Sequence, residues 1–160
     1  MTTEHVEIID RATEKAHIWL NDLAAELHDG DRHYAYRVLR AFLHALRDHL
    51  SVDEAAQLSA QLPILIRGIY YEGYVPSRAP EHARDLDSFL ERIAKEAVLG
   101  GETEASFAAQ AASAVLQRHV SADEGRDVLQ VLPRHIRDLL DTPPGTVATL
   151  TSGAEAAAAS

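Results

Sequence analysis

Five basic side chains recur at helical spacing in a chain whose net charge is negative, and they are the first residues that could do chemistry. They are His33, Arg37, Arg40, His44 and Arg47. At about 100° per residue on a helix, these positions fall within a sector of roughly 80°, opposite an apolar stripe. Arginine binds carboxylates and phosphates through paired hydrogen bonds. The spacing therefore predicts a basic ridge that could dock an acidic helix, a carboxylate or a phosphate.

The same ridge has a second interpretation, in which it is a solvated helix face that pairs with acidic residues of neighbouring helices. The positions seventy residues further along the chain carry no basic side chain. They are Thr103, Phe107, Gln110, Ala114 and Gln117. Because the second half of the chain lacks the ridge, we infer that the fold does not require it. Both interpretations stay open.

All five tyrosines lie in the first half of the chain. They are Tyr34, Tyr36, Tyr70, Tyr71 and Tyr74. Tyrosine and arginine are frequent in binding hot spots, so the rings beside Arg67 and Glu72 could form a recognition surface. Alternatively, the rings cover the end of the first half and their hydroxyls reach backbone groups. The candidate binding site therefore consists of the ridge and five further residues, which are Arg67, Tyr70, Tyr71, Glu72 and Tyr74.

Motifs for metal binding and catalysis are incomplete or missing. Glu14 and His17 form one Glu-x-x-His pattern, whereas carboxylate-bridged di-iron bundles need two such patterns and two further carboxylates. The chain has no cysteine, which excludes thiolate metal sites and disulfides. It also lacks a Gly-x-Ser-x-Gly elbow and a Gly-rich phosphate loop. We therefore expect no metal, no cofactor and no enzymatic activity.

Composition is typical of an ordinary soluble domain. The chain has 160 residues, 46% hydrophobic and 25% charged, with a net charge of -10 at pH 7. Phosphate backbones and anionic lipid repel such an acidic protein, so we expect neither nucleic acid nor a membrane as a partner. No apolar run approaches the roughly 20 residues of a spanning helix, and the first ten residues do not resemble a secretion signal. We expect a cytoplasmic protein.

The elements that carry these residues repeat with an offset of seventy residues. Ser51, Glu54 and Pro63, for example, recur as Ser121, Glu124 and Pro133. Within each copy, apolar residues recur every three or four positions, which predicts four helices per copy. The expected helices span about 4–28, 32–49, a short segment after position 51, and 63–72, and then about 81–99, 104–119, a short segment after position 121, and 133–141.

Helix ends also carry recognisable signals. Gly30 and Gly100 follow the first helix of each copy, where we expect them to form left-handed C-caps. A serine followed three residues later by glutamate, at 51–54 and again at 121–124, predicts two capping boxes. These motifs indicate structure and carry no chemistry.

The predicted fold is all-α, with two tandem four-helix repeats packed into one helical domain. The expected boundaries are residues 1–72 for the first repeat, 73–80 for a connector rich in proline and glycine, 81–141 for the second repeat, and 142–160 for a flexible, disordered tail. Units of about seventy residues bury little apolar surface alone, so we expect the two repeats to share one core.

Four segments of the first half carry a family resemblance. They are AYRVLR at 35–40, LHALRD at 43–48, QLPILIRG at 61–68, and YYEGY at 70–74 followed by Pro76-Ser77. With these segments the chain resembles the bacterial domain-of-unknown-function family 2267 over roughly residues 5–141. The resemblance implies an all-helical, tandem-repeat, cytoplasmic bacterial protein with no assigned reaction. It implies a fold and no active site.

We therefore expect a non-enzymatic interaction module, a scaffold or adaptor that binds a protein partner or associates with itself. One alternative is a small-ligand or anion-binding protein whose site lies between the ridge and the tyrosine-rich loop. Another is a cargo-like protein that the tail, around Val147 and Leu150, tethers to a larger assembly. An enzyme would need His44, Glu72 and a tyrosine within hydrogen-bond reach of each other.

Overall fold

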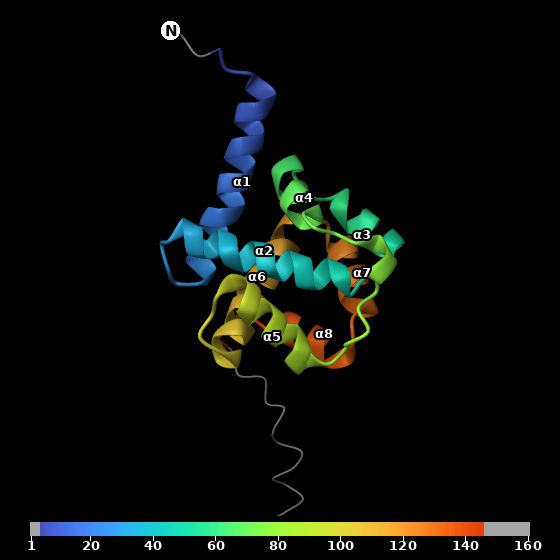
Figure 1. The fold of residues 1–160 in the computed structure, drawn as a ribbon. Helices are drawn as coiled ribbons and strands as arrows, with labels where there is room; N and C mark the ends of the chain where they lie inside the picture. Colours follow the sequence, from blue (N-terminus) through green and yellow to red (C-terminus); the bar gives the residue numbers. More distant parts are fainter. Residues whose placement is uncertain (1–3, 146–160) are drawn as a thin grey trace, which may run out of the picture.

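The computed structural model describes residues 4–145, which fold into eight α-helices and one short 3-10 helix with no strand among them (Figure 1). The predicted all-α fold is confirmed. The helices are α1 (Glu7–Glu26), α2 (Arg32–Asp48), α3 (Val52–Ser59), α4 (Ile64–Tyr71), η1 (Pro76–Arg78), α5 (Leu86–Ala97), α6 (Glu102–His119), α7 (Ala122–Val131) and α8 (Arg134–Leu140). From residue 146 onward, the predicted tail lies outside the described residues.

Helices α2 and α6 occupy the centre of the molecule. α2 packs against α1, α4, α5 and α6, and α6 in turn packs against α1, α5, α7 and α8. Figure 1 shows α2 running across the middle, with α4 on one side and α5 on the other. The core contains Phe42 and Leu46 of α2 together with a run of buried alanines in α6, whose small side chains permit close helix contact.

Contacts in the first half have counterparts seventy residues later. α1 packs on α2 as α5 packs on α6, and α2 contacts α5 as α6 contacts α1. Tyr34 and Glu104 occupy equivalent positions, and the Tyr34 hydroxyl donates to Glu104 Oε1 over 2.9 Å. These paired contacts support an internal repeat. The division into two four-helix repeats stays a prediction.

Only the C-terminal half of α1 is packed into the body. Trp19 and Leu23 are buried, whereas Val6, Ile8 and Ile9 are 57%, 73% and 61% exposed. Figure 1 shows the N-terminal part of α1 extending away from the other helices. The apolar residues at this end of α1 are therefore not packed against other parts of the described chain.

The glycines expected to cap two helices do not have that role. The left-handed residues are His28, with φ of 54°, and Val98, with φ of 57°. Each lies two positions before the predicted glycine, so the prediction for Gly30 and Gly100 is wrong. The chain turns earlier because backbone hydrogen bonds back to α1 and α5 close there: Asp29 N donates to Ala24 O and Leu99 N to Ala94 O.

Two other helix starts differ from the sequence expectation. α5 begins at Leu86 and not near Glu81, because the Glu81 side chain accepts hydrogen bonds from the next two backbone amides and holds a turn there. The capping box of α3 is complete. In α7 the Ser121 hydroxyl caps Glu124 N, but the Ser121 amide donates to Gln61 Oε1 of the first half over 3.1 Å. The second predicted capping box is therefore only half formed.

Candidate functional site

Burial of the basic ridge increases along α2. His33 and Arg37 are exposed, Arg40 is half-buried, and His44 and Arg47 are each only 3% exposed. The expectation of a solvated face is therefore wrong for His44 and Arg47. These two side chains are buried because α4 and α5 pack on the ridge side of α2, so the C-terminal half of α2 has neighbours on all sides.

The two outer arginines bind α5 and the segment after α4. Arg37 Nε donates to the Ala97 carbonyl over 3.1 Å, at the end of α5. Arg40 donates to both oxygens of Glu72, over 3.1 and 3.3 Å, and to Glu96 over 3.3 Å. The Arg40 guanidinium lowers the pKa of Glu72 from its ordinary value, chiefly through this hydrogen bond. Both arginines are thus partly committed to contacts within the chain.

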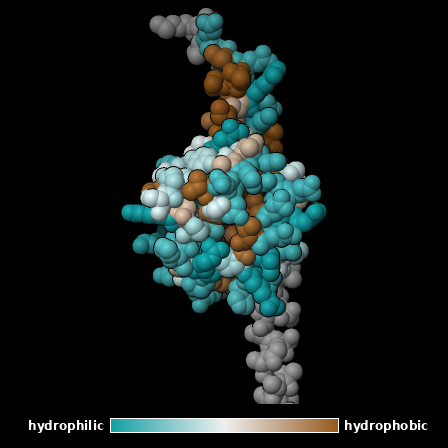
Figure 2. Space-filling model, turned by 90° about the vertical axis from the view of Figure 1, so that its right-hand side faces the viewer, coloured by the Kyte–Doolittle hydropathy of each residue, from teal (hydrophilic) through white to brown (hydrophobic). Residues whose placement is uncertain are grey.

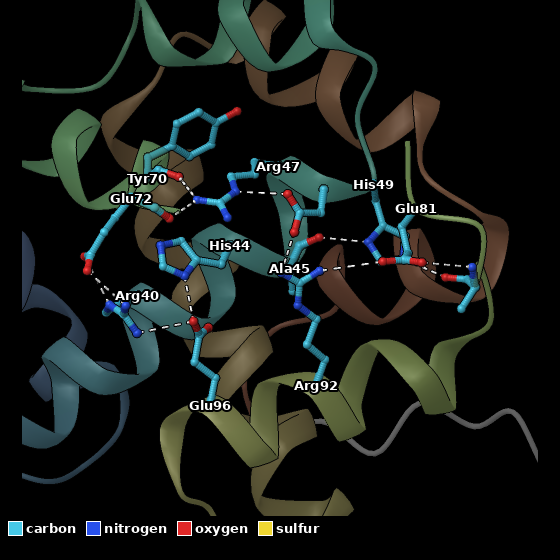
Figure 3. A network of polar contacts seen from close by, with 12 residues as sticks. Arg40, His44, Ala45, Arg47, His49, Tyr70, Glu72, Glu81, Arg92 and Glu96 are labelled. Atoms are coloured by element: carbon cyan, nitrogen blue, oxygen red, sulfur yellow. Dashed lines mark hydrogen bonds and ion pairs between the residues drawn. The ribbon is translucent and has the colours of Figure 1, made fainter. Parts of the chain in front are cut away.

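His44 lies between two oxygen acceptors, of which Figure 3 shows the carboxylate of Glu96. Its Nδ1 is 2.6 Å from Glu96 Oε1, and its Nε2 is 2.7 Å from the Ile69 carbonyl. Both nitrogens of the buried ring are thus within hydrogen-bond distance of an oxygen atom. The second carboxylate oxygen of Glu96 is buried and has no hydrogen bond within the described residues. His44 therefore joins α2 to both α4 and α5.

Arg47 closes the end of α4. Its Nη1 donates to the carbonyls of Tyr70 and Glu72, each over 2.6 Å, and its guanidinium lies 5.3 Å from the centre of the Tyr74 ring. Its Nε donates to Asp48 over 3.0 Å. The last carbonyls of a helix have no partner within the helix, so a buried arginine here satisfies groups that would otherwise be stranded.

Tyr70 and Arg67 also donate to backbone groups, whereas the buried Tyr74 hydroxyl has no hydrogen bond within the described residues. Tyr70 is fully buried, and its hydroxyl donates to the Ala55 carbonyl over 2.9 Å. Tyr71 packs between the rings of Tyr70 and Tyr74. Arg67 donates to the Ser59 and Leu62 carbonyls over 2.8 and 3.0 Å. For Tyr70 these contacts favour the interpretation in which the hydroxyls reach backbone groups.

Sequence reasoning missed three members of this network. Asp48 bridges Arg47 and Arg92. Glu96 bridges Arg40 and His44, as Figure 3 shows. A signal for them exists in the sequence, because 44 and 48 on α2 are four apart, as are 92 and 96 on α5. When the two helices run antiparallel, His44 faces Glu96 and Asp48 faces Arg92, so each residue meets one of complementary charge. Finding that signal requires knowing that α2 and α5 are neighbours.

No hydrogen bond joins the side chains of His44 and Glu72 within the described residues. His44 contacts Glu96 and a backbone carbonyl, while the Glu72 carboxylate pairs with Arg40. A hollow of about 350 Å³ does lie where the ridge meets the loop after α4, and Arg47, Arg78 and Arg92 line it together with two carboxylates. One of these, Asp48, already holds two of the three arginines. The hollow therefore offers an anion little uncommitted positive charge.

In a pH titration, we expect Tyr34 and Tyr70 to form a late group that ionises at higher pH than an ordinary tyrosine. Burial and the hydrogen bond to Glu104 raise the pKa of Tyr34 to about 12, and burial raises the pKa of Tyr70 still further. These folded-state pKa values exceed the ordinary value of 10.0, so the stability that the neutral hydroxyls contribute is complete below pH 10 and is lost as the pH rises through about 12. Phenolate absorbance against pH measures the two groups.

In Tyr70→Phe, the late-titrating absorbance is expected to fall by one tyrosine while the early part is unchanged. Far-ultraviolet circular dichroism recorded in the same titration should show the helices opening together with the late group. Ionisation of all the tyrosines in one step near pH 10, with the helices intact, would contradict the burial of Tyr70.

The described part of the chain, residues 4–145, contains no group of three or more His, Asp or Glu side chains that could hold a metal ion. None of its helices has both the length and the apolar character needed to cross a membrane. Fold and site together define a class: a small all-helical protein whose main polar cluster, on α2, forms its hydrogen bonds with neighbouring helices of the same chain.

The family follows from comparison with known proteins. Residues 16–139 match the family described as "Uncharacterized conserved protein (DUF2267)". The chain belongs to this family, as its resemblance indicated. No curated protein matches the chain.

Proposed function

We propose that this protein is a non-enzymatic helical interaction module that associates with a second copy of itself through the N-terminal half of α1. We call residues 6–17 the α1 arm. The observation that carries the proposal is the exposure of Val6, Ile8 and Ile9 on a helix that leaves the body. Figure 2 shows these projecting turns with hydrophobic side chains gathered along them. An exposed apolar patch of this kind is typical of an interaction site.

The apolar spacing of α1 suits a helix partner. Residues at heptad spacing run along the helix as Val6, Ile9, Thr13, Ala16, Leu20, Leu23 and Leu27. The last members of this row, Leu23 and Leu27, are buried against the body, while the first members are exposed on the arm. A row of apolar residues every three and four positions is the seam of a coiled coil. The arm therefore presents a seam without a partner.

Charge along the arm favours an antiparallel second copy. Glu7 and Asp10 make its outer end acidic, whereas Glu14 and Lys15, near the body, carry no net charge together. In an antiparallel pair, the acidic end of each arm lies beside Lys15 of the other, whereas a parallel pair places like charges together. Arg11 is paired with Glu7 within the same helix.

The seam is short, so the association should be weak. Stable interfaces have roughly 20–30 residues a side, and the arm has only a few apolar ones. We expect a monomer–dimer equilibrium that depends on concentration over the micromolar to millimolar range.

The proposal includes a cytoplasmic location in a bacterium, which the acidic, cysteine-free composition supports.

Sedimentation equilibrium of the full chain tests the proposal. Val6→Glu/Ile9→Glu is expected to weaken dimer formation about tenfold, because it places two charges on the seam. The matched control is Val52→Glu/Val131→Glu, which adds the same charge at exposed apolar positions of α3 and α7 and should leave the equilibrium unchanged. A wild-type chain that stays monomeric at millimolar concentration would contradict self-association.

Orientation is tested by exchanging charges. Lys15→Glu alone is expected to weaken the dimer by placing it beside Glu7 of the second copy. Adding Glu7→Lys to the same chain restores the complementary pairing and should recover the wild-type equilibrium. Failure of the double variant to recover, with circular dichroism unchanged, would count against the antiparallel arrangement.

A further inference from the structure

One helix of the first half exposes more apolar surface than its packing explains. Arg67 is the only charged residue of α4, and Ile66 and Tyr70 are buried in the core. On the side of α4 that faces away from these two residues, Ile64 and Leu65 are 67% and 44% exposed. A helix with apolar residues on all sides is usually buried on all sides. This side of α4 has no such cover within the described residues.

Gly68 extends the exposed apolar surface of α4. At about 100° per residue, Gly68 lies next to Ile64 on the surface of the helix. A β-carbon added to Gly68 would meet nothing within 4 Å, so the helix is open to approach there. The absence of a side chain lets another backbone come close. We call Ile64, Leu65 and Gly68 the α4 face.

The second half of the chain provides a comparison for the α4 face. α8 packs on α5 as α4 packs on α1. The residues of α8 that lie seventy positions after the α4 face are Arg134, His135 and Asp138. Arg134 and Asp138 form an ion pair over 3.8 Å. A helix in this position therefore folds with polar residues there, so packing within one chain does not require the α4 face to be apolar.

The first helices of the two halves differ in length. α1 begins at Glu7, whereas α5 begins at Leu86, which corresponds to position 16 of the first half. α5 thus has no counterpart of the α1 arm. The half with an arm has an apolar α4 face, and the half without an arm has polar residues at the same positions. This coincidence indicates that an arm covers the α4 face.

The arm that covers the α4 face comes from another chain. α1 is one continuous helix from Glu7 to Glu26, so its outer end does not fold back onto α4 of the same chain. In the antiparallel pair of arms, the outer end of one arm lies beside Lys15 of the other, close to where α1 enters the body. α4 packs on α1, and Figure 1 shows α4 and the arm on the same side of α2.

We propose that the α4 face receives the outer end of the α1 arm of a second copy. This inference rests on the proposed self-association and specifies where each arm ends. The contact occurs twice in a two-fold dimer, because each copy supplies one arm and one α4 face. It brings Glu7 and Asp10 of the arm towards Arg67, so the charges complement each other. It also adds apolar area to a seam that is short for a stable dimer.

Sedimentation equilibrium of Ile64→Arg/Leu65→His tests the contact. This variant gives α4 the residues that α8 carries at the equivalent positions, so we expect it to fold. Its dimer should be about tenfold weaker than that of the wild type, because apolar area is lost at both contacts. The matched control is Val52→Arg/Val131→His, which places the same side chains at exposed apolar positions of α3 and α7. An unchanged equilibrium in folded Ile64→Arg/Leu65→His would overturn the proposal.

A spin label locates the arm without any change in α4. The chain has no cysteine, so Glu4→Cys carries a nitroxide at a single place. Nitroxide-labelled chains are mixed with isotope-labelled chains that lack the nitroxide, so any broadening of an amide signal arises between two chains. We expect broadening at Leu65 and Gly68 and none at Asp138. Broadening confined to residues 6–17 would overturn the contact with α4.

These measurements separate the contact with α4 from self-association itself. Dimerisation of the wild type that is weakened by Val6→Glu/Ile9→Glu, but not by Ile64→Arg/Leu65→His, would leave the pairing of the arms intact and overturn only the contact with α4. A wild-type chain that stays monomeric at millimolar concentration would overturn both proposals.

Discussion

Replacing Arg47 with methionine is expected to lower the free energy of unfolding by about 3–5 kcal/mol. Methionine matches the length of the aliphatic stem but donates no hydrogen bond. The variant therefore strands the Tyr70 and Glu72 carbonyls, which Arg47 satisfies over 2.6 Å, and it removes one partner of Asp48. Groups left unpaired in a buried site lose their contact with water without replacement, which is what makes such truncations costly.

Arg40→Met is the control for this result. Its side chain is about one-third exposed and pairs with Glu72 and Glu96 at the edge of the cluster. Water and salt screen such pairs, so we expect a cost of about 0–1 kcal/mol. Urea unfolding followed by circular dichroism measures both variants. Similar costs for Arg40→Met and Arg47→Met would show that closing the end of α4 is not the main role of Arg47.

Arg47→Lys addresses geometry at constant charge. A single ammonium on a flexible stem cannot reproduce the planar fork that reaches the Tyr70 carbonyl, the Glu72 carbonyl and Asp48 together. We expect Arg47→Lys to lie between the wild type and Arg47→Met in stability. That order would attribute part of the effect to hydrogen-bond geometry and the remainder to charge.

The helices could be predicted from the sequence because their apolar periodicity is strong and local. α2 and α6 begin and end within two residues of the expected positions. The glycine caps were wrong because Gly30 and Gly100 fit a general preference, whereas the turn is set by hydrogen bonds that place His28 and Val98 in the left-handed region. The preference for glycine at a helix end has no effect where backbone hydrogen bonds end the helix before the glycine is reached.

The candidate site was predicted only in part, since its residue types were right and its environment was not. Periodicity places Arg47 opposite the apolar stripe of α2, and that side of a helix is usually solvated. Here α4 and α5 cover it, and the sequence of α2 alone contains no information on these neighbours. The same limit concealed the partner of His44, because Glu96 lies on a helix more than fifty residues away.

The arginines of the first-half cluster already have acceptors within the chain, which makes the cluster on α2 a weak candidate for a binding site. In the first half, Arg47 and Arg67 each donate to two backbone carbonyls. In the second half, Gln117 stands in place of Arg47, and Arg137 has no such partners within the described residues. A ligand gains most where the protein has left donors unused, which counts against the cluster beside α4 as a binding site.

Replacing Trp19 with alanine is expected to lower the free energy of unfolding by about 3–5 kcal/mol. Trp19 is 2% exposed, and its ring stacks on His119 with the ring centres 4.6 Å apart. His119 in turn contacts Asp22 of α1 over 2.7 Å. The substitution leaves a cavity at the point where α1 leaves the body, so it should also loosen the attachment of the α1 arm.

Trp19→Phe separates ring size from ring character. Phe89 occupies the equivalent position in the second half, where it packs edge-on against His49 at 5.3 Å. Because a phenyl ring serves there, we expect Trp19→Phe to cost only about 1–2 kcal/mol. Urea unfolding followed by circular dichroism measures both variants, with exposed His17→Ala as a control that should change stability by about 0.5 kcal/mol or less. Equal costs for the alanine and phenylalanine variants would mean that the two halves do not share this packing, which would weaken the prediction of an internal repeat.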